Sequence, residues 1–445
     1  MKVSVIGTGY VGLVTGVCLA EKGQQVICVD LDPQKVESIN RGVPPIYEPG
    51  LQELLQKNAG KRLRATTDLR CAVLETELSF IAVGTPSTNG EIDLRYVQEA
   101  ARQIGSALHE KDSYHLVVVK STVVPGTTEG TVLPLLEKAS GKKAGRDFGL
   151  AMNPEFLTEG EAVQDFMFPD RIVLGGIDEK SIGRLEELYA AFPDAQRVRC
   201  NPKTAEMIKY ASNCLLATMI SFSNELGSLC AALGGVDIVD VMRGLHLSKY
   251  LTALLPGGDC VTAPIASFLW AGCGFGGSCL PKDVKALIAH GARVGQPMQL
   301  LESVLRINEQ QPRQVLKLLK KHFPQLTGVR IAILGLAFRP QTSDMRESPA
   351  LPIIRDLLVE GACLRAYDPA ARDEAQKIFA DGELQFCESL AEAIADAQAI
   401  VLVTRWDEFR NLPELLRHLE PLPVLIDGRR MLDQRQFAKY EGIGR

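Results

Sequence analysis

A glycine-rich turn near the start of the chain constrains the fold more than any other feature of the sequence. A short apolar strand over 3–6 is followed directly by Gly7-Thr8-Gly9-Tyr10-Val11-Gly12. Helical apolar spacing then continues to Ala20, and a second apolar strand over 26–29 ends at Asp30. Strand, glycine turn, helix, strand and acid is the order of a dinucleotide-binding βαβ unit. The chain is therefore predicted to begin with a Rossmann-like domain.

Each residue type in this motif has a physical reason. Gly7 allows the tight turn, Gly9 lets the backbone approach a pyrophosphate, and Gly12 lets helix and strand pack closely. The helix N-terminus presents free N–H groups to the phosphates. Asp30 can accept both ribose hydroxyls and would repel a 2′-phosphate, which favours NAD over NADP. The alternative is a glycine turn in another α/β fold, with Asp30 only capping the next helix.

Three further predicted strands each end in a polar turn. The strands cover 78–83, 115–119 and 148–152, and the turns are Gly84-Thr85-Pro86, Lys120-Ser121-Thr122 and Asn153-Pro154-Glu155. In an open parallel sheet, ligands bind beyond the carboxyl ends of the strands. We therefore expect these turns to surround the same crevice as Gly9.

The pattern changes to long helices after residue 200 and returns to α/β near residue 328. Helical apolar spacing continues without a breaker over 204–233, which is typical of a helix that bridges domains or forms a subunit interface. It resumes over 281–290 and 300–323. Strands are predicted again over 329–334, 364–367, 399–403 and 424–426, with a poorer glycine fingerprint.

The fold class that follows is α/β, with two Rossmann-like doubly wound domains joined by a long central helix. We place an NAD-binding domain at 1–200, a central helical and dimerisation domain at 201–310, and a domain for a different nucleotide at 311–445.

Composition excludes several classes of function. The 49 Lys and Arg residues against 54 Asp and Glu give a net charge of −5, which argues against a nucleic-acid-binding protein. No membrane span is expected, because no apolar run reaches 18 residues. The 11 cysteines form no C-x-x-C pair, so we expect reduced thiols, no metal site and no disulfides. A strand that starts at Lys2 leaves no room for a signal peptide, and we expect a cytoplasmic protein.

The most distinctive chemical segment is Gly274-Phe275-Gly276-Gly277-Ser278-Cys279-Leu280-Pro281-Lys282-Asp283. We expect its glycines to clear space for a ligand to reach the sulfur. Pro281 suits a helix start, so Cys279 lies near a helix N-terminus, where the dipole and Lys282 would favour thiolate. Asp283 is a candidate acid or base. The alternative is a buried cysteine in a glycine turn.

Two pairs of residues are spaced i, i+4. Lys209 and Asn213 would share one face of the long helix and could stabilise an oxyanion, although such pairs are usually solvated surface. Glu155 and Glu159 follow the end of a strand. Two negative charges so near to each other would raise the pKa of one of the two carboxyl groups, which suits a general base. The alternative for these two acids is an ordinary polar first turn of a helix.

Together these motifs resemble the UDP-glucose/GDP-mannose dehydrogenase family, in order and along nearly all 445 residues. The cysteine segment is the most specific of the matching motifs. The others are the N-terminal fingerprint with Asp30, 83–86, 121–127, Asn153-Pro154-Glu155-Phe156-Leu157, 169–173, 335–340, Asp344-Met345-Arg346-Glu347-Ser348 and Trp406-Asp407-Glu408-Phe409.

The resemblance implies a four-electron oxidation of UDP-glucose to UDP-glucuronate with two NAD per turnover. Cys279 would attack the aldehyde to form a thiohemiacetal, and the thioester that follows would be hydrolysed. Lys209, helped by Asn213, would stabilise the oxyanions. Glu155 or Glu159 would act as base for the hydrolytic water, and Thr122 and Asp283 would position water or take a proton.

The resemblance also implies binding sites and an oligomer. The residues implied for the cofactor are Gly7, Gly9, Tyr10, Val11, Gly12, Asp30, Lys35, Thr85, Pro86, Thr122, Glu159, Lys282 and Arg346. The residues implied for the UDP-sugar substrate are Glu155, Phe156, Leu157, Lys209, Asn213, Lys249, Phe275, Gly276, Cys279, Phe338 and Arg339. A homodimer or a higher homo-oligomer is expected, with the long helix at its interface.

One segment departs from the family pattern. Over 246–270 the arginine that reaches the substrate across the dimer interface in the family is missing, and His246-Leu247-Ser248-Lys249-Tyr250 stands there instead, with Lys249 as a candidate substitute. GDP-mannose and UDP-N-acetylhexosamines are therefore rival substrates, although Ser278 stands where acetamido-sugar enzymes typically have histidine. Two competing hypotheses are a two-electron NAD dehydrogenase with a structural Cys279 and a redox-sensing binding protein.

Overall fold

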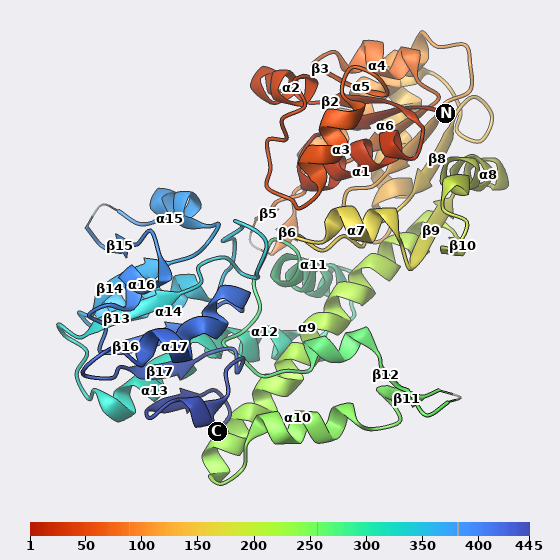
Figure 1. Ribbon diagram of the computed structural model, residues 1–445. Helices are drawn as coiled ribbons and strands as arrows, with labels where there is room; N and C mark the ends of the chain where they lie inside the picture. The colour runs from red at the N-terminus through yellow and green to blue at the C-terminus, as the bar shows by residue number, and fades with distance from the viewer. Residues whose placement is uncertain (89, 256, 381) are drawn as a thin grey trace. The chain divides into compact units, whose positions relative to one another are not determined.

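The computed structural model describes residues 1–88, 90–255, 257–380 and 382–445. The chain forms two compact units, Met1–Ser212 and Asn213–Arg445 (Figure 1). Each unit is built around its own parallel or mostly parallel sheet with helices packed on it. This confirms the predicted α/β class with two Rossmann-like domains and a long central helix. The division into three domains, with boundaries after 200 and 310, stays a prediction.

The first unit contains an eight-stranded sheet in the order β10-β9-β8-β7-β4-β1-β2-β3. Its strands are β1 (Lys2–Ile6), β2 (Gln25–Val29), β3 (Leu63–Thr66), β4 (Leu78–Ile81), β7 (Leu116–Val119), β8 (Gly149–Met152), β9 (Arg171–Gly176) and β10 (Gln196–Cys200). The six neighbouring strands β8, β7, β4, β1, β2 and β3 are parallel. β2 and β3 lie on one side of β1 and the later strands lie on the other, so the strand order reverses between β1 and β4. β9 runs antiparallel to β8, and β10 runs parallel to β9, so the direction of the strands reverses at this edge of the sheet.

Helices cover the first sheet. They are α1 (Tyr10–Glu21), α2 (Pro33–Asn40), α3 (Leu51–Asn58), α4 (Leu69–Glu75), α5 (Arg95–His109), α6 (Leu133–Ser140), α7 (Ala162–Met167) and α8 (Glu179–Leu188), with a π-helical turn at Thr128–Val132, a 3₁₀ turn at Tyr189–Ala191, and a small hairpin of β5 (Ser87–Thr88) and β6 (Glu91–Ile92). Successive residues of β1 point to opposite faces. Val3 and Val5 pack in one buried cluster with α1, while Ile6 packs in another with α5. The sheet is therefore the middle of three layers.

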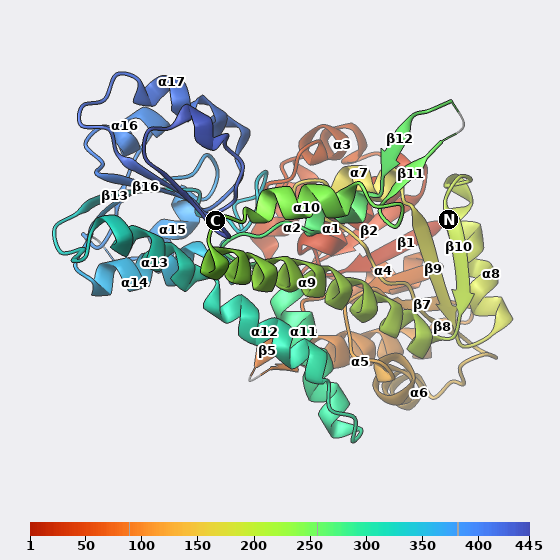
Figure 2. The ribbon, with the colours of Figure 1, turned by 90° about the horizontal axis from the view of Figure 1, so that it is seen from below.

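Helix α9 (Pro202–Leu233) is continuous over 32 residues (Figure 2). Its first turn is fixed by Asn201, whose Oδ1 accepts from Thr204 N at 2.8 Å, and by the buried Glu206, which accepts from Thr128 N at 2.8 Å. Among the described helices, α9 alone is long and apolar enough to cross a membrane, a weak indication because core helices of globular proteins pass the same test.

The second unit contains a six-stranded parallel sheet in the order β15-β14-β13-β16-β17-β18. Its strands are β13 (Arg330–Leu334), β14 (Cys363–Tyr367), β15 (Gln385–Phe386), β16 (Ala399–Leu402), β17 (Val424–Asp427) and β18 (Tyr440–Gly442). If the six parallel strands of each sheet are numbered along the chain, both sheets have the order 3-2-1-4-5-6. The expected repetition of the first architecture is therefore confirmed.

The helices of the second unit are shorter than α9; those expected over 281–290 and 300–323 are present, the latter in two parts. They are α10 (Ile238–His246), α11 (Leu280–Arg293), α12 (Gln299–Gln310), α13 (Pro312–His322), α14 (Ala350–Val359), α15 (Arg372–Ile378), α16 (Leu390–Ile394) and α17 (Leu412–Leu416); 3₁₀ turns lie at Pro264–Phe268, Asp407–Asn411 and Gln434–Gln436, and β11 (Thr252–Leu254) pairs with β12 (Cys260–Thr262). The helical pattern expected over 300–323 is broken into α12 and α13. Pro312 has no N–H to donate to α12, and it begins α13 instead.

Candidate active site

The glycine turn between β1 and α1 has the geometry of a nucleotide-binding loop. Gly7 has φ +97°, and a Cβ at Gly12 would lie 1.9 Å from the carbonyl oxygen of Gly7, so both positions exclude a side chain. Gly9 is the residue before α1, has no neighbour within 4 Å of an added Cβ, and provides no side-chain cap. The first N–H groups of α1 are therefore left for a ligand, as a pyrophosphate requires.

Asp30 lies at the carboxyl end of β2 and is fixed by backbone donors. Its Oδ2 accepts from Thr8 N at 2.9 Å and Thr8 Oγ1 at 2.5 Å, and its Oδ1 accepts from Asp32 N at 3.1 Å. Burial opposes the charge, but these hydrogen bonds and the charge of Lys35 on α2 outweigh it and hold the pKa of Asp30 below its usual value. The cap of α2 is Asp32, whose side chain accepts from Gln34 N, so the alternative role of Asp30 as a cap was wrong.

Replacing Asp30 with asparagine is expected to raise the KM for NAD about tenfold, which corresponds to about 1.4 kcal/mol of lost interaction with the ribose. The variant should also use NADP measurably, because the charge that would repel a 2′-phosphate is gone. Initial rates with both cofactors test this, with Asp32→Asn as the control. An unchanged KM for NAD would contradict the assignment of Asp30 to the ribose.

The predicted turns after β4, β7 and β8 are neighbours, because these three parallel strands are adjacent in the sheet. Ser121 Oγ donates to Val83 O at 2.6 Å, and Thr85 Oγ1 donates to Thr122 O at 2.9 Å. The structure thus brings Thr85 and Thr122 together at the sheet edge that also carries the glycine turn. The exposed Pro86 belongs to the same turn as Thr85.

Glu155 and Lys209 form a buried ion pair. Lys209 Nζ lies 3.0 Å from Glu155 Oε1, and both side chains are almost fully buried. Leu157 N donates to Glu155 Oε2 at 2.6 Å. Burial of Glu155 opposes its charge, but the Lys209 ammonium, the Leu157 N–H and the charge of Lys120 together outweigh burial and lower the pKa of Glu155. Phe156 packs beside the pair, with its ring centre 5.6 Å from Lys209 Nζ.

Two expectations about these residues were wrong. No helix includes 153–158, so Glu155 and Glu159 do not share a helix face, and Glu155 is not the acid whose pKa is raised, because Lys209 helps to lower it. The surface alternative for Lys209 and Asn213 was also wrong, since both are buried. Lys209 pairs with Glu155 and Asn213 donates to Asp283, and their joint role toward an oxyanion stays a prediction.

The turn that carries Glu159 is held by a residue that sequence reasoning missed. Glu48 accepts from Gly160 N at 2.8 Å and from Ala162 N at 2.7 Å, and the hydroxyl of Tyr10 donates to it. Burial, together with Glu48, raises the pKa of Tyr10. Tyr10 lies within the glycine fingerprint and begins α1, so Glu48 joins α1 to the Glu159 turn. No local pattern marks Glu48, because its partners are 38 and more residues away in the chain.

In the second unit, Cys279 is the residue immediately before α11, with Pro281 in the first turn. Its Sγ lies 3.5 Å from Ser278 Oγ, and the residue is partly exposed. Its predicted position at a helix N-terminus is confirmed, and the alternative of a buried cysteine was wrong. Partial exposure at the positive end of a helix dipole is the setting that favours a reactive thiolate.

Asp283 lies one turn into α11 and is fully buried. Its Oδ2 accepts from Asn213 Nδ2 at 2.6 Å, and its Oδ1 accepts from Lys282 Nζ at 2.6 Å. Burial, with the charge of Asp283, raises the pKa of Cys214 to about 12, so that thiol stays protonated. The cluster of Asn213, Lys282 and Asp283 gives the start of α11 a fixed set of polar groups beside Cys279.

The glycines before Cys279 serve close packing, which corrects the expectation that they clear space around the sulfur. A Cβ at Gly276 would lie 2.2 Å from Glu347 O, and one at Gly277 would lie 2.7 Å from the ring of Phe338. Gly277 N also donates to Arg346 O at 2.8 Å. The loop is thereby fixed to the turns that follow β13, which places Phe338 next to the cysteine loop.

The second sheet repeats the fold of the first but not its ribose site. Asp368 ends β14 as Asp30 ends β2, yet its Oδ2 accepts from Leu336 N at 2.7 Å, Ala337 N at 3.0 Å and Trp406 Nε1 at 3.1 Å. Its Oδ1 accepts two further backbone N–H groups. Asp368 is also buried, whereas Asp30 is partly exposed, so Asp368 has less room than Asp30 to accept a ribose hydroxyl.

The remaining candidate residues differ in their exposure. Phe275 is buried and its N–H donates to Asn308 Oδ1 at 2.8 Å. Arg346 is exposed and pairs with Asp344 in its own turn, while Arg339 is partly exposed. Lys249 lies in an exposed turn after α10 with its ammonium 5.9 Å from the ring centre of Tyr250. Val11 is in the first turn of α1.

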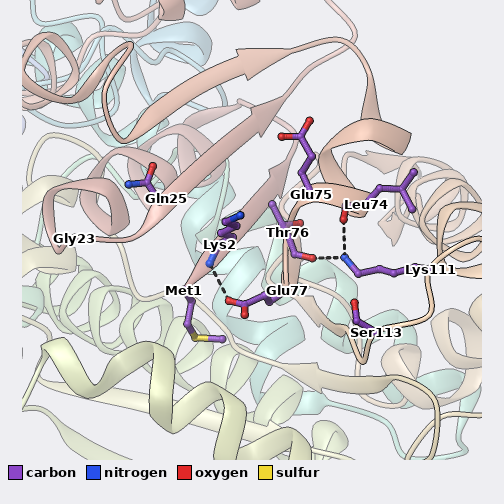
Figure 3. A pocket seen from close by; sticks show the side chains of 10 residues that line it. All are labelled: Met1, Lys2, Gly23, Gln25, Leu74, Glu75, Thr76, Glu77, Lys111 and Ser113. Carbon is purple, nitrogen blue, oxygen red and sulfur yellow. Dashed lines mark hydrogen bonds between the residues drawn. The ribbon is translucent and has the colours of Figure 1, made fainter.

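Two other features take no part in this site. Among the described residues, no group of three His, Cys, Asp or Glu could hold a metal ion. A polar cavity of about 430 Å³ lies at the amino ends of β1, β2, β4 and β7, the sheet edge opposite the glycine turn (Figure 3). It is lined by Met1, Lys2, Gly23, Gln25, Leu74, Glu75, Thr76, Glu77, Lys111 and Ser113.

Comparison with known proteins gives one family along the chain. Residues 1–193 match the NAD binding domain of the UDP-glucose/GDP-mannose dehydrogenase family, 203–310 its central domain, and 332–434 its UDP binding domain. The chain is 42% identical to UDP-glucose 6-dehydrogenase AglM of Haloferax volcanii, covering 100% of both chains. It is 40% identical to GDP-mannose 6-dehydrogenase of Azotobacter vinelandii, again over 100% of both.

Among solved structures, a UDP-glucose dehydrogenase from the archaeon Pyrobaculum islandicum is similar throughout. It has a TM-score of 0.90 and 39% identity, and the match covers 100% of this chain and 97% of that one.

Proposed function

Because the chain belongs to the UDP-glucose/GDP-mannose dehydrogenase family, and is therefore an NAD-dependent oxidoreductase, we propose that it oxidises UDP-glucose to UDP-glucuronate. The reaction takes four electrons and proceeds through a covalent adduct on Cys279. The observation that carries this proposal is the partly exposed Cys279 at the start of α11, beside the buried Asp283. UDP-glucose is favoured because relatives matched over at least 93% of their length are named for it.

Gly9 and Asp30 would hold NAD, which would supply the hydride acceptor for each of the two oxidations. The Cys279 thiolate adds to the carbonyl carbon of the aldehyde and forms a thiohemiacetal, which keeps the aldehyde bound between the oxidations. Addition of the thiolate leaves the oxygen of this adduct as an oxyanion, so loss of hydride from its carbon re-forms the C=O bond and leaves a thioester. Water then attacks the thioester carbon, the C–S bond breaks, and the thiolate is released with the uronate carboxylate.

Glu155 and Lys209 supply opposite charges to these steps. The Lys209 ammonium stabilises the oxyanion of each tetrahedral species, because a fixed charge in a buried site needs no reorganisation. Glu155 is ionised at neutral pH and accepts a proton from the hydrolytic water, which Thr122 helps to position. Asp283 holds Asn213 by a hydrogen bond, so the amide keeps one orientation.

A direct assay decides the substrate. UDP-glucose, GDP-mannose, UDP-N-acetylglucosamine and UDP-N-acetylmannosamine are each incubated with the purified enzyme and NAD in a closed cell, and NADH is followed at 340 nm. We expect kcat/KM for UDP-glucose to exceed the others at least tenfold. The GDP-mannose relative makes GDP-mannose the second candidate. A preference for it would leave the reaction type intact and replace the substrate.

We also propose that the enzyme is a cytoplasmic homodimer and that α9 lies in the interface. Leu215, Phe222 and Leu229 recur every seven residues on α9, and their side chains are 51%, 46% and 54% exposed. A heptad-spaced apolar stripe is the pattern that pairs with a second helix.

Phe222→Glu is expected to convert the dimer to a monomer, because two buried carboxylates would face each other across a two-fold interface. Light scattering at several concentrations measures the mass, with Val359→Glu, at an exposed position on α14, as the control. A Phe222→Glu protein that stays dimeric would exclude this stripe from the interface.

A further inference from the structure

One buried lysine of the first unit has no part in the chemistry proposed so far. Lys120 directly follows β7 and is 3% exposed. Its Nζ donates to Asn153 Oδ1 at 2.9 Å and to Asn153 O at 3.4 Å, which are neutral oxygens. The rings of Phe80 and Phe166 lie 5.5 and 6.0 Å from the ammonium. A cation is thus held inside the protein without a hydrogen-bonded carboxylate.

The partner of Lys120 connects it to the catalytic pair. Asn153 Oδ1 also accepts from Tyr189 OH at 2.5 Å, and Asn153 Nδ2 donates to Val173 O at 2.8 Å. Asn153 begins the segment Asn153-Pro154-Glu155. Lys120 therefore holds the first residue of this segment, while Lys209 holds the third. The two lysines fix the segment from both ends.

Keeping this charge buried is costly for the fold. Transfer of an ammonium from water to a protein interior is unfavourable unless it is paired, and an apolar side chain of similar length would avoid the penalty. Burial lowers the pKa of Lys120 to about 8, although the charge of Glu155 opposes this effect; the charge of Lys209 is a smaller cause in the same direction as burial. Lys120 in turn lowers the pKa of Glu155. Buried titratable groups at such positions are typical of functional sites.

We propose that Lys120 is a positioning residue for the oxidation: it fixes the Asn153–Glu155 segment and supplies a second positive charge that keeps Glu155 ionised while Lys209 binds a substrate oxygen. This rests on the roles proposed for Glu155 and Lys209 in the oxidation. The groups that face Lys120 are Asn153 and Glu155 after β8, Tyr189 of the 3₁₀ turn, Lys209 of α9, and the rings of Phe80 and Phe166.

The test compares Lys120→Met with Lys111→Met. Lys111 is a matched control because burial also lowers its pKa to about 8, but its ammonium donates to carbonyl oxygens at the end of α4, at the opposite sheet edge. For Lys120→Met we expect kcat to fall about 30-fold, within the range for loss of base assistance, with the KM for NAD unchanged. The acid limb of the kcat profile should move up by about one pH unit, because Glu155 loses a positive neighbour. Lys111→Met should keep the wild-type profile.

If Lys120→Met does not fold, Lys120→Gln carries the same test, because its amide can still donate to Asn153 while the charge is absent. A variant with the wild-type kcat and the same acid limb overturns the proposal. A loss of kcat with an unshifted acid limb also overturns it, since that is what a purely structural role would give.

A second readout does not depend on activity. The pKa of Lys120 is lower in the folded chain than in the unfolded one, so the unfolded state binds more protons above pH 8, and wild-type stability should rise with pH from about 8 to 10.5 by linkage. The melting temperature of Lys120→Met should rise less over this window than that of the wild type. Equal rises overturn the inference. If the wild type oxidises none of the four sugar nucleotides, the proposed function fails, and this measurement still decides the charge of Lys120.

Discussion

Cys279→Ser is expected to stop the reaction at one NADH per UDP-glucose and to lower overall turnover at least 1000-fold, which corresponds to about 4 kcal/mol in the activation barrier. A serine hydroxyl at the same helix start does not ionise near neutral pH, so neither the thiohemiacetal nor the thioester forms. The measurement is the ratio of NADH formed to UDP-glucose consumed, taken at completion with excess NAD.

The control for this variant is Cys71→Ser, which changes another partly exposed cysteine, in the first turn of α4. It should leave both the rate and the ratio unchanged. If Cys279→Ser still formed two NADH per substrate, Cys279 would be structural, and the second oxidation would have to proceed without a covalent adduct on this thiol.

Lys209→Met is expected to have a large effect on both stability and activity. It leaves Glu155 buried without its cation, and removing one partner of a buried pair typically costs about 3–5 kcal/mol at neutral pH. Turnover should fall at least about 100-fold with the loss of a preorganised charge near the reacting oxygen. Urea unfolding and steady-state rates measure the two effects.

The pH dependence of stability should change sign in this variant. In the wild type the pKa of Glu155 is lower in the folded state than in the unfolded state. Its contribution to the free energy of unfolding is therefore present above the unfolded-state pKa and is lost as the pH falls through the folded-state pKa. In Lys209→Met the ammonium is gone, so burial raises the folded-state pKa of Glu155. The free energy of unfolding should then fall as the pH rises through this raised pKa.

Two further variants isolate the ion pair. The double variant Lys209→Met with Glu155→Gln should recover stability but not activity, because it removes both charges together. Lys203→Met, an exposed site in the first turn of α9, is the control. A Lys209→Met protein as stable as the wild type at pH 7 would contradict the buried pair.

The parts of the fold that sequence predicted are those set by local chemistry. The turn at Gly7 needs a positive φ, the helix after it shows apolar spacing, and Pro281 favours a helix start; each of these signals lies within a few residues of its effect. The antiparallel β9 was not predicted as such, because strand direction depends on how the chain returns to the sheet. Pro312 is a local signal for a break between two helices, but the apolar spacing on both sides of it predicted one continuous helix.

The candidate site was predicted in its residue types more than in its contacts. Two observed pairs join residues that are far apart in the chain: Glu155 with Lys209, and Asn213 with Asp283. The i, i+4 spacing had suggested other pairs, Glu155 with Glu159 and Lys209 with Asn213. Gly276 and Gly277 were correctly singled out, but their reason is the close approach of Glu347 and Phe338, which only the folded loop reveals.

Counting electrons tests the proposed role of Cys279 without any variant. Purified enzyme, excess NAD and a limiting, known amount of UDP-glucose are taken to completion, and NADH is compared with the uronate formed. A thiol that carries the aldehyde to a carboxylate predicts two NADH for each sugar nucleotide, with no free aldehyde. A ratio of one, with the aldehyde as product, would contradict it.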